Sequence, residues 1–481
     1  MIRLPRSGPR PHRDPRPRPA AAGASSTTDS AGASPPPEPR SGTRRDLCAA
    51  GAAVLLVTVA VLVGRHIQDT RHTLFVHWPP VFAEWEPHVG PGTPAAVVLA
   101  VAGVAYGPSL AARLPWRALL AAAWAASLAW IVSLALVDGW QRGIAGRLTA
   151  KEEYLRVIGR FHDIPATLRD FTHHIVSGTP HPWPAHVAGH PPGATLTFVL
   201  LDRIGLHGGG WAGTWCIVLG SSACVAVLIA LRALTDESLA RRAAPFLVLP
   251  PAAVWLGTSA DGFYAAVAAW ALALLALALT RRSPAGAWPW AAASGLLFGL
   301  TCYLSYGLTL FAVIGAAVLL LGRGGLRPVL VAAFVAGLAV VPVAFTLAGF
   351  NWWTAYHLLV TRYYQGIGGT RPYGYWVWAN LACTALITGP ATAAGLRRTG
   401  TGLAHRTDPA RTRLAFLVAA ALLALLLADL SGLSKAETER IWLPFAMWLL
   451  PACAFLPRPR AWLAAQTILA LLLNHLLLTG W

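Results

Sequence analysis

One apolar segment decides the fold: residues 194–206 read ATLTFVLLDRIGL. A helix needs about 20 consecutive apolar residues to cross the hydrocarbon core of a bilayer. This segment is shorter, and it contains Asp202 and Arg203, whose charges are costly at membrane depth. We therefore predict that it forms an amphipathic helix lying at the membrane interface rather than a helix that spans the membrane.

The composition of the whole chain is that of a membrane protein. Of its 481 residues, 56% are hydrophobic and only 12% are charged, whereas a soluble domain has roughly 25% charged residues. Lipid must therefore surround most of the fold, where only helices or closed barrels satisfy the polar backbone groups. About thirteen apolar runs of suitable length predict spanning helices near residues 47–64, 94–112, 117–137, 211–232, 242–257, 262–280, 286–304, 305–321, 328–349, 376–395, 412–431, 441–456 and 460–479.

The distribution of arginine predicts which ends of these helices share a side. If residues 194–206 do not span, every arginine-rich connection falls on the side of the N-terminus, and if they span, five of the six change sides. These connections are residues 113–117, 232–242, 281–282, 323–327, 397–413 and 458–460. Because short cytoplasmic loops carry an excess of basic residues, we expect a multi-pass protein of the cell membrane with its N-terminus in the cytoplasm.

The formal net charge of +18 reports this topology and contact with anionic lipid. A surface that binds nucleic acid would gather basic and aromatic residues on one face, and the sequence has no such face. The six cysteines stand inside apolar runs, so disulfides and zinc sites built from thiolates are not expected. We therefore expect the lipid bilayer as a partner, and no nucleic acid.

Two regions follow from these patterns. Residues 1–46 are rich in Pro, Arg, Ser and Gly and predict a disordered, basic cytoplasmic tail. Residues 47–481 predict the transmembrane domain, an all-α polytopic helix bundle. Four segments are expected on its extracytoplasmic side, where their Trp, His, Tyr and Pro content indicates ordered, functional loops. These outer segments are residues 65–93, 138–210, 350–375 and 431–440.

The second outer segment holds the candidate catalytic carboxylates. Asp138 directly follows the third span, and Glu152 and Glu153 come later in the segment. A carboxylate that is partly desolvated near the lipid headgroups gains proton affinity and can act as a base toward a hydroxyl. The alternative is that Asp138 only ends the helix and that the glutamates face water. Further on, His190 precedes two prolines and a glycine, which fix the entry to the interfacial helix.

Candidate contacts to a phosphate or a sugar lie in the other outer segments. Asp261 follows the fifth span, where capping of the next helix is the alternative role. Arginine binds phosphate through paired charge-assisted bonds, and an aromatic ring beside it can stack on a sugar, although an interfacial aromatic belt is the alternative. Such residues in the segment 350–375 are Arg362, Tyr363, Arg371 and Tyr373.

The segment 431–440 brings charge to the mouth of the twelfth span. Arg440 stands there with Glu439 beside it and Glu437 three residues earlier. An exposed helical Glu–Arg pair contributes only a few tenths of a kcal/mol. The alternative is that Arg440, at the lipid boundary, holds a lipid phosphate within reach of the outer loops.

Five histidines cluster in residues 173–190 of the second outer segment, and two of them have the spacing of a metal chelate on a helix. His186 and His190 lie four residues apart. The intervening glycine and the following prolines argue against a helix at that point. We expect no cofactor; a divalent metal stays open as the alternative, as does contact of a histidine with a sugar or a phosphate.

Two of these motifs resemble a known superfamily. Glu152-Glu153-Tyr154 in a long outer loop, followed by His190-Pro191-Pro192-Gly193 before an interfacial helix, is similar to the GT-C membrane glycosyltransferases. The protein O-mannosyltransferase and aminoarabinose-transferase group is the nearest, with Asp-Glu and His-Pro-Pro-Leu at these places. The Gly-His-Pro-Pro-Gly motif also resembles integral membrane proteins of actinobacteria, whose GC-rich genomes favour the Ala, Gly, Pro and Arg of this chain.

The resemblance implies a GT-C-like fold and a glycosyltransferase that moves a sugar from a polyprenyl-phosphate donor to an unknown glycan or protein acceptor, with inversion. It implies a base in the loop that holds Glu153, but such enzymes often keep their base near a helix end, as at Asp138, so both residues stay open. It also implies roles for Asp261 and for the pair Glu439 and Arg440. The rival functions are a transporter or flippase of lipid-linked sugars and a structural partner of cell-envelope enzymes.

Overall fold

The computed structural model describes residues 40–281, 283, 286–322, 327–405 and 408–480. Most of the expected cytoplasmic tail, residues 1–39, lies outside the described residues. The first helix begins at Arg40, so the helix takes in residues 40–46, which the sequence placed in the tail. The reason is tertiary, because Asp46 is fully buried there and pairs with Arg397 and Arg398.

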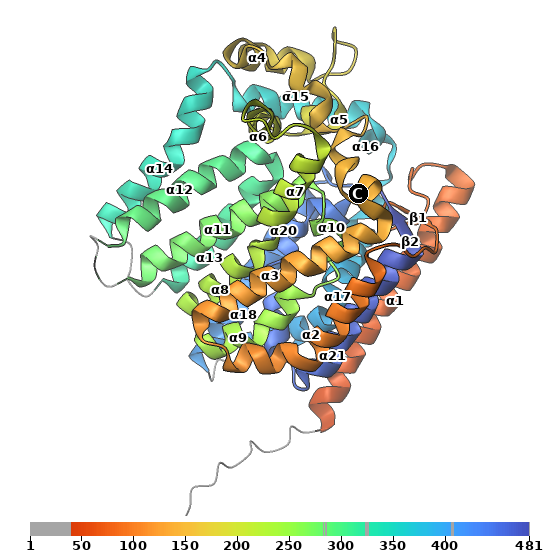
Figure 1. The fold of residues 1–481 in the computed structure, drawn as a ribbon, viewed down its shortest axis with the longest axis vertical. Helices are drawn as coiled ribbons and strands as arrows, with labels where there is room; N and C mark the ends of the chain where they lie inside the picture. The colour runs from red at the N-terminus through yellow and green to blue at the C-terminus, as the bar shows by residue number, and fades with distance from the viewer. Residues whose placement is uncertain (1–39, 282, 284–285, 323–326, 406–407, 481) are drawn as a thin grey trace, which may run out of the picture. The chain divides into compact units, whose positions relative to one another are not determined.

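The regular secondary structure of the described chain is almost entirely helical, with one pair of short strands (Figure 1). The helices are α1 (Arg40–Arg71), α2 (Thr93–Arg113), α3 (Trp116–Ala135), α4 (Ile164–Asp170), α5 (Ala185–Gly189), α6 (Pro192–Arg203), α7 (Gly208–Ser221), α8 (Ala223–Leu234), α9 (Glu237–Val248), α10 (Ala253–Leu256), α11 (Ala260–Thr280), α12 (Trp288–Leu304), α13 (Phe311–Leu321), α14 (Pro328–Leu347), α15 (Trp352–Gln365), α16 (Ile367–Thr370), α17 (Tyr373–His405), α18 (Pro409–Leu430), α19 (Thr438–Ile441), α20 (Leu443–Ala446) and α21 (Pro459–Leu476). Short helical turns cover Leu136–Asp138, Gln141–Ala145, Arg147–Thr149, Tyr154–Arg160, Phe171–His174, Tyr306–Leu310 and Leu450–Phe455, and the strands are β1 (Ala83–Trp85) and β2 (Leu477–Thr479).

Seven helical segments in the described chain are long and apolar enough to cross a membrane, which confirms a polytopic helical membrane protein. They are Gly42–Arg71, Thr93–Arg113, Trp116–Asp138, Gly208–Leu234, Ala260–Thr280, Pro328–Leu347 and Pro409–Leu430. The other expected spans coincide with shorter or interrupted helices. For example, the run 242–257 is divided between α9 and α10 at Pro250 and Pro251, because proline lacks the N–H that a continuing helix needs. The number thirteen stays a prediction.

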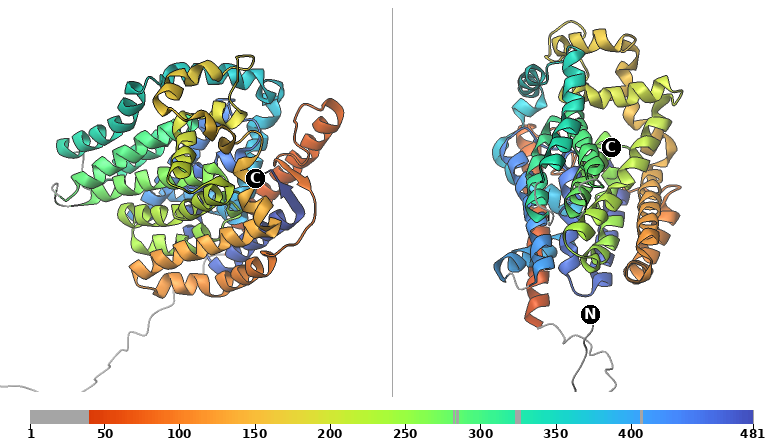
Figure 2. Two further views of the ribbon diagram at one scale, coloured as in Figure 1. Left: turned by 45° about the horizontal axis from the view of Figure 1, so that its top comes forward. Right: turned by 90° about the vertical axis from the view of Figure 1, so that its left-hand side faces the viewer.

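Most of the apolar segment 194–206 lies in α6, a helix of twelve residues. At about 1.5 Å of rise per residue it is roughly 18 Å long, too short for a hydrocarbon core of about 30 Å. It lies beside α4 and α5 at the upper end of the bundle in Figure 1. Both views of Figure 2 show this yellow part of the chain and the cyan α15 at the same end.

The arginine-rich connections meet at the opposite end of the helices. Arg241 donates to the Ala111 carbonyl at 2.7 Å, and Arg413 donates to the Leu321 carbonyl at 2.9 Å. Arg398 donates to Asp46 at 2.7 Å. These contacts join the ends of helices far apart in the chain, so the connections share one side, as the non-spanning interpretation of residues 194–206 requires.

The outer segments are tied together on the other side. Strand β1 pairs with β2 in antiparallel register, with Glu84 opposite Leu478. This pairing fastens the first outer segment to the end of α21. Phe82, just before β1, donates its backbone N–H to Glu439 at 3.0 Å. The outer segments therefore form one connected layer over the helix ends.

Candidate active site

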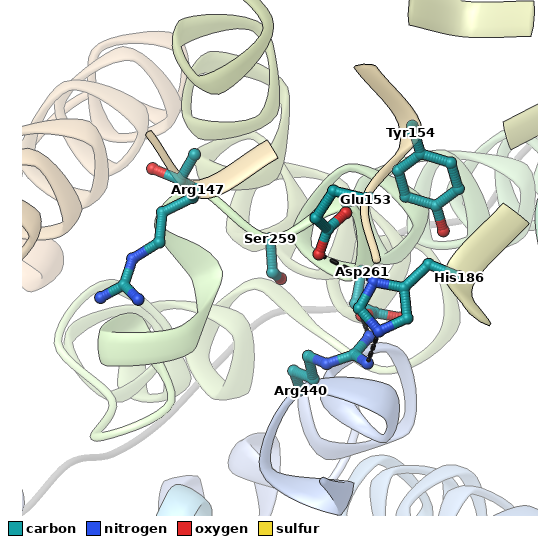
Figure 3. A pocket seen from close by; sticks show the side chains of 9 residues that line it. Arg147, Glu153, Tyr154, His186, Ser259, Asp261 and Arg440 are labelled. Carbon is teal, nitrogen blue, oxygen red and sulfur yellow. Dashed lines mark hydrogen bonds and ion pairs between the residues drawn. The ribbon is translucent and has the colours of Figure 1, made fainter. Parts of the chain in front are cut away.

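A small pocket lies within this layer, where α11 begins. Its lining residues come from the loop after α3, the α5 turn, the start of α11 and the α19 turn (Figure 3). They are Arg147, Glu153, Tyr154, His186, Thr258, Ser259, Ala260, Asp261 and Arg440. The accessible volume is about 10 Å³, which is room for one water molecule. The pocket is therefore too narrow for a sugar or a phosphate in this conformation.

His186 connects a carboxylate to a guanidinium at the centre of the pocket. Its Nδ1 lies 2.8 Å from Oε1 of Glu153, and its Nε2 lies 3.0 Å from Nη2 of Arg440. Arginine carries only donors, so Nε2 must accept the bond from Arg440. The proton of the neutral imidazole is then on Nδ1, which donates to Glu153. The contacts thus fix the tautomer of His186.

Arg440 is held by two carboxylates as well as by His186. Its Nη1 lies 2.6 Å from Asp261, and its Nη2 lies 2.8 Å from Glu437. Burial lowers the pKa of the guanidinium, but Asp261 and Glu437 raise it by more, so the net pKa is raised. Arg440 therefore keeps its full charge although its side chain is only 7% exposed.

Asp261 faces the pocket rather than capping its helix. The cap of α11 is Ser259, whose hydroxyl accepts the backbone N–H of Gly262 at 3.3 Å. Asp261 is the second residue of the helix, and its side chain points to Arg440 (Figure 3). The capping role that the sequence allowed for Asp261 is thus taken by its neighbour.

Glu153 is buried, with one oxygen held and one available. Its side chain is 7% exposed, and His186 binds Oε1, whereas Oε2 has no hydrogen-bond partner among the described residues. A buried carboxylate oxygen without a partner is costly, and such atoms mark places where a ligand or water binds. Glu153 is therefore the pocket carboxylate best placed to accept a proton from a bound hydroxyl.

Glu152 points away from the pocket and holds the α5 turn in place. It is exposed, and its Oε2 accepts the backbone N–H of Ala185 at 2.9 Å. The Glu152 carbonyl also accepts the backbone N–H of His186 at 3.2 Å. Its role is thus to position the turn that carries His186.

Asp138 lies next to the pocket but does not line it. Its oxygens contact His88 at 2.8 Å and Arg147 at 3.0 Å. Arg147 does line the pocket, and burial lowers the pKa of its guanidinium to about 10. Arg147 also donates to the Thr479 carbonyl at 3.3 Å. Asp138 therefore holds an arginine of the pocket wall and has both oxygens engaged.

His190 lies behind the pocket in a buried polar chain. Its Nδ1 is 2.8 Å from the His186 carbonyl and 3.1 Å from the hydroxyl of Tyr154, which Tyr264 contacts at 3.1 Å. Burial lowers the pKa of His190 to about 4, so the ring is neutral near pH 7. His190 supports the backbone of His186 rather than facing the cavity.

The remaining predicted residues lie around the α19 turn or on α15. Arg371 is buried and donates to the carbonyls of Leu74 and Lys435. Tyr363 accepts the backbone N–H of Lys435, and Tyr373, which is exposed, donates to the Leu430 carbonyl. Arg362 is half-buried near the end of α15.

Glu439 points away from the pocket that its neighbour Arg440 enters. It is fully buried, accepts the backbone N–H of Phe82 at 3.0 Å, and lies 3.4 Å from the Cys383 sulfur. Burial raises the pKa of its carboxyl to about 7. Glu439 thus fastens the first outer segment to the turn that carries Arg440.

Of the residues predicted from the sequence, the structure brings Glu153, Asp261 and Arg440 into one pocket. It leaves the others outside the pocket lining. Sequence reasoning missed Arg147 as a wall residue, and it considered His186 as a metal ligand or as one of several histidines that could contact a sugar or a phosphate. The signal for His186 was its position four residues before the His-Pro-Pro motif. Within the described ranges, no group of three or more His, Cys, Asp or Glu side chains has the geometry to hold a metal ion.

Comparison with known proteins gives structural matches only. No family model and no curated protein matches the sequence. The Archaeoglobus fulgidus oligosaccharyltransferase in its apo form is similar, with 14% identity, a TM-score of 0.45, and coverage of 71% of this chain and 50% of that one. ArnT from Cupriavidus metallidurans bound to undecaprenyl phosphate is similar at 14% identity and a TM-score of 0.44, with coverage of 68% and 59%. The chain thus spans about half the length of these proteins, both of them GT-C glycosyltransferases.

Proposed function

We propose that this protein is a membrane glycosyltransferase that moves a sugar from a polyprenyl-phosphate donor to an acceptor hydroxyl at the extracytoplasmic face. The observation that carries the proposal is the convergence of Glu153, Asp261 and Arg440 in one pocket. Sugar transfer from a lipid phosphate needs a base for the acceptor and fixed positive charge for the phosphate. The pocket supplies both.

The position of the pocket relative to the spanning helices suits a donor that enters from the bilayer. The pocket includes Ser259 and Asp261, which stand at the start of α11, a helix apolar enough to span. A lipid phosphate lies at the boundary between hydrocarbon and water, which is the level of the end of a spanning helix. The donor's tail would then lie along apolar helix surface.

Glu153 is the proposed general base. Its Oε2 is buried and has no partner in the described structure, so an acceptor hydroxyl can donate to it directly. His186 donates to Oε1 and fixes the carboxylate in one orientation. Asp138, the other candidate, has both oxygens bound to His88 and Arg147. We therefore assign the base to Glu153 and a supporting role to Asp138.

The proposed reaction is a direct inverting displacement. The acceptor oxygen attacks the anomeric carbon from the face opposite the phosphate while its proton passes to Glu153. The bond between that carbon and the phosphate oxygen breaks, and the phosphate leaves with the electron pair. Arg440 and Arg147 would stabilise the departing charge, because preorganised donors in a dry site cost little reorganisation. The narrow pocket must widen to admit the donor.

The transporter alternative has less support in the structure. A path for charged headgroups would need ionisable side chains along the spans. In the seven candidate spans of the described chain, Asp, Glu, Lys and Arg stand near the ends, as Asp261 does in α11 and Asp429 does in α18. These charges lie where a surface site would use them.

The test compares Glu153→Gln with Glu84→Gln in membranes supplied with polyprenyl-phosphate sugars. Both changes replace a carboxylate by an amide on the same side, and Glu84 is exposed on β1. Loss of a general base lowers the rate by roughly 10²–10⁴-fold, so we expect that loss for Glu153→Gln and wild-type rates for Glu84→Gln. Equal transfer by both variants, or no transfer by the wild type with every donor, would refute the proposal.

A further inference from the structure

Glu437 is placed between two buried arginines, Arg440 of the pocket and Arg371 beside the α19 turn. One of its oxygens, Oε2, lies 2.8 Å from Nη2 of Arg440, and the other, Oε1, lies 3.5 Å from Nη1 of Arg371. Both guanidiniums are 7% exposed. A phosphate that bridges two guanidiniums offers each of them one oxygen in the same way. The Glu437 carboxylate thus occupies the position of a bridging anion.

Arg371 depends on Glu437 for charge compensation. Its other bonds go to backbone carbonyls of Leu74 and Lys435, and Glu437 is its only ion-pair partner within the described residues. A buried guanidinium left without an anion is strongly unfavourable. Glu437 can therefore leave this position only when another anion takes its place.

The backbone at Glu437 is held in a conformation that L-residues rarely adopt. Ala436 has a φ of 71° and Glu437 a φ of 61°, both in the left-handed region that favours glycine. Contacts must maintain two such residues in succession. The pairing of Glu437 with the two arginines is one such contact, so its release would let this turn relax.

The charge of the site also opposes a phosphate while Glu437 is present. Burial raises the pKa of Glu437, but Arg440 and Arg371 lower it by more, so the carboxyl is ionised. Its negative charge stands directly beside Arg371 and Arg440, where it would repel the charge of an approaching phosphate.

We infer that Arg371 and Arg440 form a phosphate-binding pair that Glu437 occupies as an internal competitor and vacates when a phosphate group enters. The inference rests on the proposed function only for the phosphate chemistry of the ligand. It assigns Glu437 to control of affinity, a role separate from proton transfer. Glu437 keeps the two buried charges compensated between turnovers and lowers the affinity for released phosphate.

The experiment measures binding rather than transfer. The full chain in nanodiscs is titrated with polyprenyl phosphate, with inorganic phosphate, and with polyprenol that lacks the phosphate. Glu437→Gln removes the charge that competes with the phosphate. It should therefore bind polyprenyl phosphate about tenfold more tightly than the wild type, which is a usual size for the coupling between two ligands. Glu84→Gln is the matched control and should bind as the wild type does. In an Arg371→Gln background, the gain from Glu437→Gln should disappear.

The titrations with polyprenyl phosphate and with inorganic phosphate identify the source of the anion. A gain with inorganic phosphate as well assigns recognition to the phosphate group alone, and a gain with polyprenyl phosphate alone assigns it to the lipid-borne group. Unchanged or weaker binding by Glu437→Gln, or an equal gain for polyprenol, would overturn the inference.

A second variant tests the inference if Glu437→Gln does not fold because its buried arginines lack a counter-charge. Glu437→Asp keeps the charge, but its shorter side chain does not reach both guanidiniums, so a gain of about threefold is expected. Unchanged binding by Glu437→Asp overturns the inference in that case. Because these assays need no sugar transfer, tighter binding without transfer would retain the inference and refute only the proposed enzyme.

Discussion

Glu439→Gln should remove a pH dependence of stability that the wild type carries. Burial raises the pKa of Glu439 to about 7, from an ordinary value of 4.5. A carboxyl with a raised pKa binds more protons in the folded state than in the unfolded state between these values. The free energy of unfolding therefore falls as pH rises from about 4.5 to about 7, by roughly 3 kcal/mol at about 1.4 kcal/mol per pKa unit.

The assay is thermal unfolding of the purified protein in detergent between pH 5 and pH 8, followed by tryptophan fluorescence. The amide of glutamine still accepts the Phe82 N–H, but it does not titrate, so the difference between variant and wild type isolates this one group. The stability of Glu439→Gln relative to the wild type should therefore increase as pH rises. A parallel pH dependence in both proteins would show that Glu439 does not titrate in this range and would refute the reasoning.

Three further predictions concern the site and the topology. His186→Phe removes the donor to Glu153 and the acceptor for Arg440. Since a lost buried partner costs about 1–3 kcal/mol, kcat/KM for sugar transfer should fall roughly 10–100-fold. An unchanged kcat/KM would exclude His186 from the site. Asp138→Asn should lower the free energy of unfolding by about 1–3 kcal/mol because it removes the charge that pairs with buried Arg147. The transfer rate per folded molecule should fall far less than in Glu153→Gln. A larger fall in rate for Asp138→Asn than for Glu153→Gln would make Asp138 the base. Gly205→Cys should react with a membrane-impermeant maleimide from outside intact cells, and labelling only after permeabilisation would contradict the outer position of the turn after α6.

The sequence alone determined the class of fold and predicted which of its loops share a side. Apolar runs and arginine-rich connections are local patterns, and the cost of charge in hydrocarbon makes them sufficient to predict helices and a shared side. The same reasoning excluded residues 194–206 from the spans, and α6 is indeed too short to cross. Residue type and position near a span also pointed to Asp261 and Arg440 before their contact was known.

Only the tertiary structure decided which outer residues meet. Sidedness places Glu153, His186 and Arg440 at the same level, but their lateral positions depend on how the helices pack, and no local pattern encodes contacts between residues so distant in the chain. Small rotations also matter, because adjacent residues of one turn, Glu439 and Arg440, face opposite ways. Hydrophobic burial sets those rotations for the bundle as a whole, and the polar residues of the site take the directions that the packing leaves them.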